Sequence, residues 1–205
     1  MHIDLEQLEF HLKKRLDFPY VWGRKQSDLW DKQTSFVYHT RSFSDLEKEI
    51  QPLSKNLQNY ALNRWLNFWS AKAVEQIFVM NEKVKPHINE YDKLVDFTIE
   101  HIPFDHKTSV FPKGFGKNLT YTLAHRGELI RWFYENQSQE GRKHYKNRIF
   151  VVLFAQNGEH WKLKTEISLL KTKIEAYLQN FSVEKLEKIT FEKEEILSDI
   201  IWIIN

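Results

Sequence analysis

Apolar residues at helical spacing predict three helices in the first half of the chain. One covers 3–17 and is closed by Pro19, and a second, short helix covers 44–51, where the letters "SDLE" supply a cap. The longest pattern runs from 59 to about 81, and we assign its apolar face to the core. The apolar stripes are Leu5, Leu8, Leu12 and Leu16 in the first helix and Leu62, Leu66, Trp69, Ala73, Ile77 and Met80 in the longest one.

The pattern changes from helical spacing to strands in the middle of the chain. Alternating polar and apolar positions predict strands at 93–100 and 102–109, with a short earlier strand near 83–88. The run "NRIFVVLFA" over 147–155 is continuously apolar. Such a run is typical of a strand that is buried on both faces of a sheet.

Helical spacing returns over 119–137 and again over about 159–180, while "ILSDIIWII" at the end predicts either a strand or a short helix. The order helix, strands, helix, strand, helix indicates the α/β class, with a mixed β-sheet flanked by helices. No repeat, low-complexity tract or long linker divides the sequence. We therefore expect a single domain over 1–205.

Composition confirms a folded chain and narrows its chemistry. The 205 residues are 41% hydrophobic and 15% aromatic, which is enough for a sizeable core. Cysteine is absent from the sequence, which excludes disulfides and thiolate metal sites. The start "MHIDLEQLEF" is acidic where a signal peptide is basic, and no apolar run reaches the length of a membrane span. We expect a cytoplasmic protein that has no membrane partner.

Positive charge is concentrated in the middle of the chain. Residues 107–148 carry 9 basic and 3 acidic side chains, a surplus of six, whereas the whole chain has a net charge of +2. Such a surplus favours a polyanionic partner, because neutralising phosphates supplies much of the affinity for nucleic acid. The alternative is a solvated basic surface.

Two acids and a lysine are expected to converge on the predicted strands. Side chains alternate along a strand, so Asp96 faces away from Phe97, and Asp105 shares a face with Lys107. Neighbouring carboxylates repel each other, and a hard cation such as Mg²⁺ offsets that repulsion. A nearby lysine can orient an attacking water. The alternative is an exposed edge with an Asp–Lys ion pair.

A third acid, Glu75, lies in the apolar stripe of the longest predicted helix. Phe68, Ala71, Phe78 and Val79 are its neighbours at helical spacing. A charge in this setting is costly unless it is paired or binds a metal. The alternatives are that Glu75 pairs with a lysine or arginine, or lies at the edge of the helix.

These residues resemble the PD-(D/E)xK nuclease superfamily, which has a restriction-endonuclease-like fold. In that superfamily a helix with a Glu precedes a meander of strands, of which one carries the first Asp and the next carries D/E-x-K; a helix and a further strand follow. The resemblance covers roughly 58–155, between an N-terminal helical extension (1–57) and a C-terminal helix with a final element (156–205). The matching segments are Glu75 in "SAKAVEQIF", Asp96 in "KLVDFTI", and Asp105 and Lys107 in "FDHKTS".

The resemblance implies hydrolysis of phosphodiester bonds with Mg²⁺ or Mn²⁺. The metal would be held by Asp96, Asp105 and Glu75 with the main-chain carbonyl of His106, and Lys107 would position the water. No proline precedes Asp96, as in many members of the superfamily. A second acid four residues earlier, Asp92, competes with Asp96 for the role of first ligand.

The helix that follows the strands is then expected to face DNA. Arg126, Arg131, Gln137 and Lys113 have the long cationic or amide side chains that contact phosphates well. Alternatively, the arginines only solvate the helix and Gln137 caps its end. Trp22, in an irregular segment, is compatible with base stacking or with packing of the amino-terminal helix.

Three functions of different classes follow from these patterns. The first is a metal-dependent nuclease acting on DNA; the second is a nucleic-acid-binding protein on the same fold that has lost catalysis; the third is a structural or regulatory protein-interaction domain. The complete motif favours the first. A homodimer is compatible with each of them.

Overall fold

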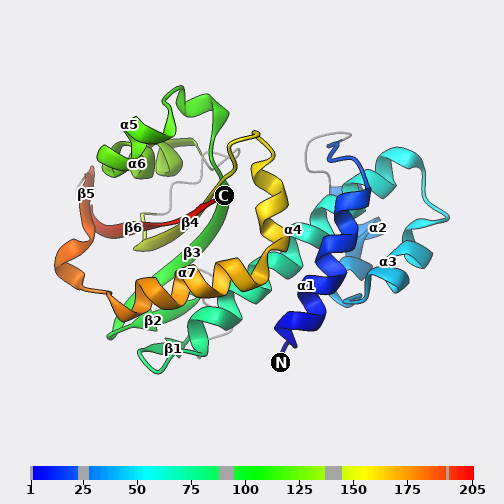
Figure 1. Ribbon diagram of the computed structural model, residues 1–205, viewed down its shortest axis with the longest axis horizontal. Coiled ribbons are helices and arrows are strands. Elements are labelled where there is room, and N and C mark those ends of the chain that lie inside the picture. The colour runs from blue at the N-terminus through cyan, green and yellow to red at the C-terminus, as the bar shows by residue number, and fades with distance from the viewer. Residues whose placement is uncertain (1, 23–27, 88–94, 137–144, 193) are drawn as a thin grey trace. The chain divides into compact units, whose positions relative to one another are not determined.

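A computed structural model of the chain describes residues 2–22, 28–87, 95–136, 145–192 and 194–205 (Figure 1). These residues form two compact units. The first unit comprises Met1–Gln76 with Lys162–Lys171, and the second comprises Ile77–Trp161 with Thr172–Asn205. Two helices, α4 (Lys55–Val79) and α7 (Ile167–Gln179), contribute to both units.

Helices are the regular secondary structure of the first unit among its described residues. The long helix α4 organises it, because its tryptophans are anchored by the segment that precedes α3. The indole of Trp65 donates a hydrogen bond to the carbonyl of Thr40, and that of Trp69 donates to Val37. Besides α4 the unit contains α1 (Leu5–Lys14), η1 (Arg15–Asp17), α2 (Asp28–Gln33), η2 (Ser35–Tyr38), α3 (Phe43–Ile50), most of η4 (His160–Thr165) and the start of α7.

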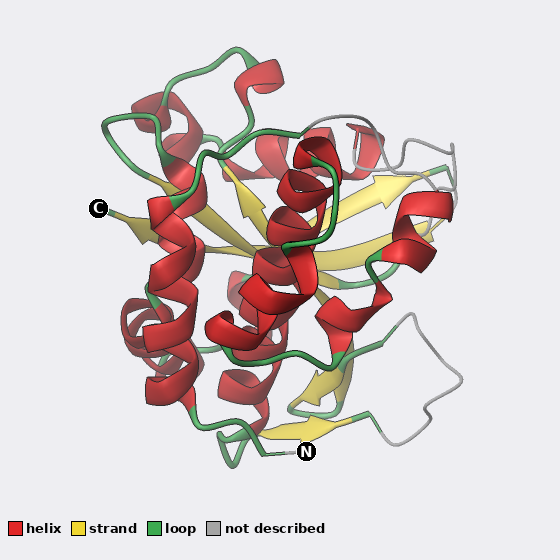
Figure 2. Cartoon of the chain, turned by 90° about the vertical axis from the view of Figure 1, so that its right-hand side faces the viewer, coloured by secondary structure: helices red, strands yellow, loops and turns green. Residues whose placement is uncertain are grey.

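A six-stranded mixed sheet, flanked by helices, forms the second unit, and this confirms the predicted α/β class. The strand order is β1-β2-β3-β4-β6-β5. Strands β3, β4 and β6 are parallel, while β2 is antiparallel to β1 and β3, and β5 is antiparallel to β6. The strands are β1 (Val84–Pro86), β2 (Phe97–Ile99), β3 (Ile102–Val110), β4 (Arg148–Phe154), β5 (Glu187–Phe191) and β6 (Glu194–Ile204), drawn yellow in Figure 2.

Apolar side chains cover both faces of the central strands. In β4, Phe150 and Val152 belong to a core cluster with residues of α6 (Arg126–Asn136), while the intervening Ile149 and Val151 are also fully buried. Figure 1 shows α6 and α7 on opposite sides of β4 and β6. The continuously apolar run over 147–155 is therefore a strand buried on both faces, as predicted.

A two-residue turn joins β2 to β3. Both of its residues, Glu100 (φ 48°) and His101 (φ 74°), have left-handed backbone conformations. Two consecutive positive φ angles are typical of the tightest hairpin turns, whose twist matches that of the strands. The turn pairs Ile99 with Ile102 and so fixes which residues of the two strands lie opposite each other.

Two predicted helices are each interrupted. The pattern over 119–137 forms α5 (Leu119–Ala124) and α6, because His125 leaves the helical conformation (φ −131°, ψ 48°) and its ring stacks on Tyr121. The pattern over 159–180 forms η4 and α7. The other expected elements occur with shifted ends, and "ILSDIIWII" lies in strand β6. The remaining short helices are η3 (Lys113–Phe115) and η5 (Val183–Lys185).

Two details of the sequence prediction were wrong. Met80 is 53% exposed and does not belong to the core, because α4 ends at Val79 and Met80 lies beyond the helical stripe. Strand β5 was missed, although Ile189 and Phe191 alternate with polar residues in "EKITF" and are buried. A five-residue alternation is too short to stand out from a loop.

Candidate functional site

The β2–β3 hairpin brings Asp96 and Asp105 to neighbouring positions. Phe97 is paired with Phe104, and the main-chain N–H of Asp96 donates a 2.9 Å hydrogen bond to the carbonyl of Phe104. Asp96, which directly precedes β2, therefore lies beside Phe104, the residue before Asp105 in β3. The structure thus places on adjacent segments the two acids that the sequence pattern selected.

The carboxylate of Asp96 is held by His106. Its Oδ2 accepts hydrogen bonds from the main-chain N–H of His106 at 2.8 Å and from the ring Nδ1 at 2.7 Å. Burial raises the pKa of Asp96, but the hydrogen bonds and charge of His106 outweigh burial and bring the pKa to about 2. Since a carboxylate can only accept, Nδ1 of His106 carries the proton of this bond.

The ring of His106 is part of an aromatic stack on the buried face of the sheet. It lies 5.9 Å from the ring of Phe97 and 6.1 Å from that of Phe78. This packing holds the His106 ring in place. The ring in turn orients the carboxylate of Asp96 through its hydrogen bond. The ligand role of the His106 main-chain carbonyl stays a prediction.

Asp105 accepts hydrogen bonds from two cationic side chains. Lys107 Nζ lies 3.0 Å from Oδ1, and Arg148 Nε lies 2.7 Å from Oδ2. The Asp105 and Arg148 side chains are only 7% and 12% exposed, whereas Lys107 is 48% exposed. Asp105 therefore has one buried and one solvent-accessible cationic neighbour.

Arg148 is a site residue that the sequence reasoning did not select. It begins β4, directly paired with Asp105 of β3, and its guanidinium also lies 5.0 Å from the ring centre of Tyr134. Burial raises the pKa of the Tyr134 hydroxyl, which donates to the carbonyl of Lys146. An arginine at the start of a strand that is buried on both faces was the available signal, because a buried charge needs a partner.

The third predicted acid, Glu75, belongs to the first unit, whereas Asp96 and Asp105 belong to the second. Glu75 is partly exposed, and its Oε2 lies 2.7 Å from Lys72 Nζ one helical turn away. Within the described part of the chain, no cluster of three or more His, Asp or Glu side chains is arranged to hold a metal ion. The role of Glu75 as a third ligand stays a prediction.

A second charged cluster surrounds Arg126 at the first turn of α6. Its guanidinium lies 2.7 Å from Glu187 and 3.0 Å from Asp199, and it donates to the carbonyl of Lys185. Asp199 also accepts from the hydroxyl of Tyr177. Burial raises the pKa of Asp199 despite these partners. The contacts of Arg126 tie α6 to β5 and β6.

The other residues predicted to face DNA occupy different settings. Arg131 is exposed on α6, with its guanidinium 4.9 Å from the ring centre of Phe191, and Lys113 is exposed at the start of η3. Gln137 and the competing acid Asp92 lie outside the described residues. Contact of these residues with nucleic acid stays a prediction.

No family model, curated protein or solved structure matches the chain. Among the residues that the structure describes, no helix is both long and apolar enough to cross a membrane. The chemistry of the hairpin is therefore the basis for a functional assignment.

Proposed function

We propose that the second unit is a metal-dependent nuclease that hydrolyses phosphodiester bonds, with DNA as its substrate. One observation carries the proposal. Lys107 Nζ lies 3.0 Å from a carboxylate oxygen of Asp105 on β3, and Asp96 directly precedes the neighbouring strand β2, where its main-chain N–H bonds the carbonyl of Phe104. Two acids and a lysine in this arrangement match the D and D-x-K elements of the PD-(D/E)xK superfamily.

The order of the elements also supports the proposal. Helix α4 is followed by strands β1 to β3, then by α5 and α6, and then by β4. This order resembles that of the restriction-endonuclease-like core, in which a helix, a meander of strands, a helix and a further strand follow one another. Strands β3 and β4 are parallel, and parallel neighbours require a crossover connection, which α5 and α6 provide.

The donor set suits Mg²⁺ or Mn²⁺, because both prefer carboxylate oxygen and keep several waters. When bound, the ion would supply Lewis acidity towards the phosphate. Asp96 and Asp105 would be its ligands from the protein. Asp105 accepts from two cations in this structure, so metal binding requires one of these contacts to open. Lys107 is the more exposed of the two and is the contact that we expect to exchange.

The protein's own groups then have distinct roles. Arg148 holds Oδ2 of Asp105, and His106 holds Oδ2 of Asp96, so each carboxylate is fixed by a largely buried partner. Lys107, released from Asp105, has three ammonium donors with which to orient a water or to contact a phosphate oxygen. Its location two residues after Asp105 keeps these donors beside the acid.

A cleavage assay tests the proposal. Single-stranded, duplex, branched and RNA substrates are incubated with the purified chain and Mg²⁺ or Mn²⁺, with EDTA as the negative control. We expect cleavage that requires the metal and is abolished in Asp105→Asn. An absence of cleavage on every substrate, with no change of melting temperature at saturating metal, would reject the nuclease.

A nucleic-acid-binding protein without catalysis is the second candidate. The specific observation in its favour is that each acid is already engaged, Asp105 by Lys107 and Arg148 and Asp96 by His106. This candidate predicts binding that weakens as salt rises, without cleavage and without stabilisation by a divalent cation. The same melting experiment therefore separates the two candidates.

A further inference from the structure

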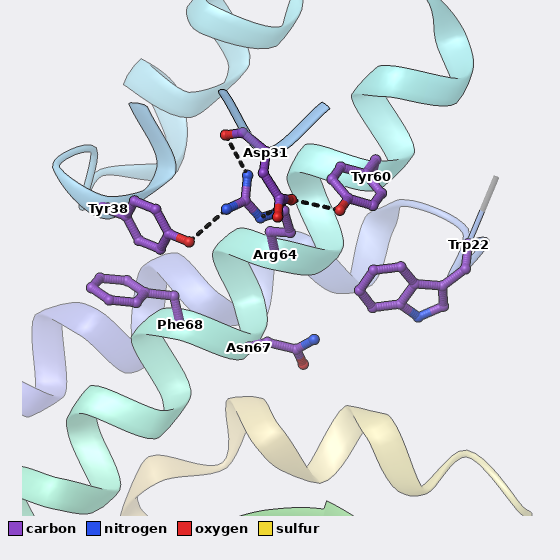
Figure 3. Close-up of a pocket in the computed structure, with 7 residues that line it drawn as sticks. All are labelled: Trp22, Asp31, Tyr38, Tyr60, Arg64, Asn67 and Phe68. Carbon is purple, nitrogen blue, oxygen red and sulfur yellow. Dashed lines mark hydrogen bonds and ion pairs between the residues drawn. The ribbon is translucent and has the colours of Figure 1, made fainter. Parts of the chain in front are cut away.

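The first unit contains a cavity of about 350 Å³ whose walls are aromatic (Figure 3). Trp22 and Tyr38 are 43% and 42% exposed there, and Tyr60 and Phe68 complete the walls. The ring of Tyr38 packs edge-on against Phe68 at 4.8 Å, and that of Trp22 packs against Tyr60 at 5.9 Å. The volume is within the usual range of small-molecule sites.

A cation of the protein itself already occupies the centre of this aromatic group. The guanidinium of Arg64 lies 5.1 Å from the ring centre of Tyr38 and 5.7 Å from that of Tyr60. It also donates to the carbonyl of Asp31 at 2.9 Å, while the Asp31 carboxylate accepts from the Tyr60 hydroxyl at 2.6 Å. A second cation is therefore disfavoured, which argues against a methylammonium or other aromatic-cage ligand.

Two hydrogen-bond donors remain at the cavity. The first is the amide Nδ2 of Asn67. Burial lowers the pKa of the neighbouring Lys164 to about 8, so Lys164 is still an ammonium at neutral pH, and it donates to Oδ1 of Asn67. Because an ammonium cannot accept, this contact assigns the amide oxygen of Asn67 and leaves its Nδ2 as a donor. The Tyr38 hydroxyl accepts from Arg64, so its own proton can also be donated.

The position of the amide fits a ligand that lies between the rings. In Figure 3 the Asn67 side chain lies between those of Trp22 and Phe68. All three side chains line the cavity, so the amide of Asn67 is available to the edge of a ring that stacks there. The cavity thus combines aromatic walls and hydrogen-bond donors with an arginine, Arg64, whose charge is paired with the Asp31 carboxylate at 3.4 Å.

We propose that this cavity binds a nucleobase, and specifically an unpaired base of a nucleic-acid strand. Bases stack on aromatic side chains and on arginine, and every base has acceptor atoms on its edge that can pair with an amide N–H. A phenyl ring of a peptide has no such acceptor. Since all four bases have acceptors, we expect little preference among them. The choice of a strand as the source of the base rests on the proposed nuclease function.

Fluorescence anisotropy with a labelled single-stranded oligonucleotide in EDTA tests the proposal without cleavage. We expect Trp22→Ala to weaken binding at least about fivefold, because one stacked base contributes about 1–3 kcal/mol. Asn67→Asp keeps an acceptor for Lys164 but replaces the donor by an acceptor, so it should weaken binding similarly. The matched control is Phe10→Ala, an aromatic of the same unit that is 59% exposed and lies outside the cavity lining.

Further arms identify the source of the base and guard against misfolding. Trp22→Phe keeps a stacking ring and should bind nearly as well as the wild type, and circular dichroism melting checks that each variant folds. A free deoxynucleotide and an unlabelled strand are each tested as competitors at equal concentrations of bases. If the free deoxynucleotide competes as strongly as the strand, the base does not have to come from a strand, and that part of the proposal is overturned. Three results would overturn the base site. The first is that a blunt duplex binds as tightly as the single strand, and the second is that no oligonucleotide or nucleotide binds. The third is that both Trp22→Ala and Asn67→Asp bind with unchanged affinity. Cleavage by the wild type and by Asp105→Asn is scored separately, so failure of one proposal is distinguishable from failure of the other.

Discussion

Arg148 and Asp105 form a cross-strand ion pair at directly paired positions of β4 and β3, with 2.7 Å between Nε and Oδ2. Both side chains are nearly buried, so neither can be removed without leaving the other charge poorly solvated. The pair therefore links the candidate catalytic acid to the stability of the sheet.

We expect Arg148→Met to lower the free energy of unfolding by about 3–5 kcal/mol, because it leaves Asp105 without its buried partner. Urea denaturation measures this change. The double variant Arg148→Met with Asp105→Leu should recover much of the loss, since no unpaired charge remains. Lys48→Met, which removes an exposed pair with Asp45, is the control and should have little effect. An equally small effect of Arg148→Met would show that the buried pair is not coupled to stability.

Lys107→Ala should separate catalysis from binding. The acids and the basic surface are intact in this variant, so affinity for metal and DNA should be largely retained. Cleavage should fall by about 10² to 10⁴, the usual contribution of a group that positions or activates water. A nicking assay with Mn²⁺ measures the rate. Lys107→Arg is the stricter variant, because arginine keeps the charge but has a different donor geometry. Full activity of Lys107→Ala would remove Lys107 from the mechanism.

Asp96 should make stability depend on acidic pH. Its folded pKa of about 2 is below the unfolded value of about 3.9, so its contribution is present above pH 4 and is lost as the pH falls through 2. The difference in pKa corresponds to about 3 kcal/mol. We expect the stability gap between the wild type and Asp96→Asn to shrink across this window in denaturant titrations.

Asp199 should make stability depend on pH in the opposite direction from Asp96. Burial raises its pKa, so its protonated form is favoured in the folded chain, and the wild type should lose stability as the pH rises through the folded pKa. Asp199→Asn lacks this titration. Its stability relative to the wild type should therefore increase with pH over the same interval. A parallel pH dependence of both variants would contradict the assignment of the two environments.

Charge reversal at Lys113 and Arg131 tests the basic middle of the chain. Both are exposed, and replacing them with Glu should weaken DNA binding and reduce its dependence on salt, because fewer phosphates are neutralised. The control is Lys55→Glu, an exposed lysine of the first unit with the same change in charge. Arg126 is unsuitable for this test, since its ion pairs hold α6. If affinity is unchanged, these two cations belong to a solvated surface.

The long periodic segments of the fold could be predicted from the sequence. The apolar stripe of α4 and the unbroken apolar run of β4 leave few alternative assignments of secondary structure. The burial of these elements requires apolar residues at the positions that face the core, and this produces the pattern in the sequence. The break at His125 could not be predicted, because it depends on a local ring stack with Tyr121 inside a continuous helical pattern. Strand β5 depends on its pairing with β6, which lies outside the local sequence.

The candidate site was predictable in its types of residue but not in their partners. The spacing of Asp96, Asp105 and Lys107 placed them on neighbouring segments. The ion pair of Asp105 with Arg148 joins residues 43 positions apart and follows from the parallel pairing of β3 with β4. Local spacing contains no information about such a pair.

The left-handed turn at Glu100 and His101 limits which insertions and deletions the hairpin can accept. One added residue on the β3 side of the turn would shift β3 by one position, so that each following side chain of the strand would face the opposite side of the sheet. The ammonium of Lys107 would then point into the aromatic stack, and the ring of His106 would point away from it. The length of this short loop is therefore constrained more strongly by the chemistry of the strands than by the loop's own two side chains.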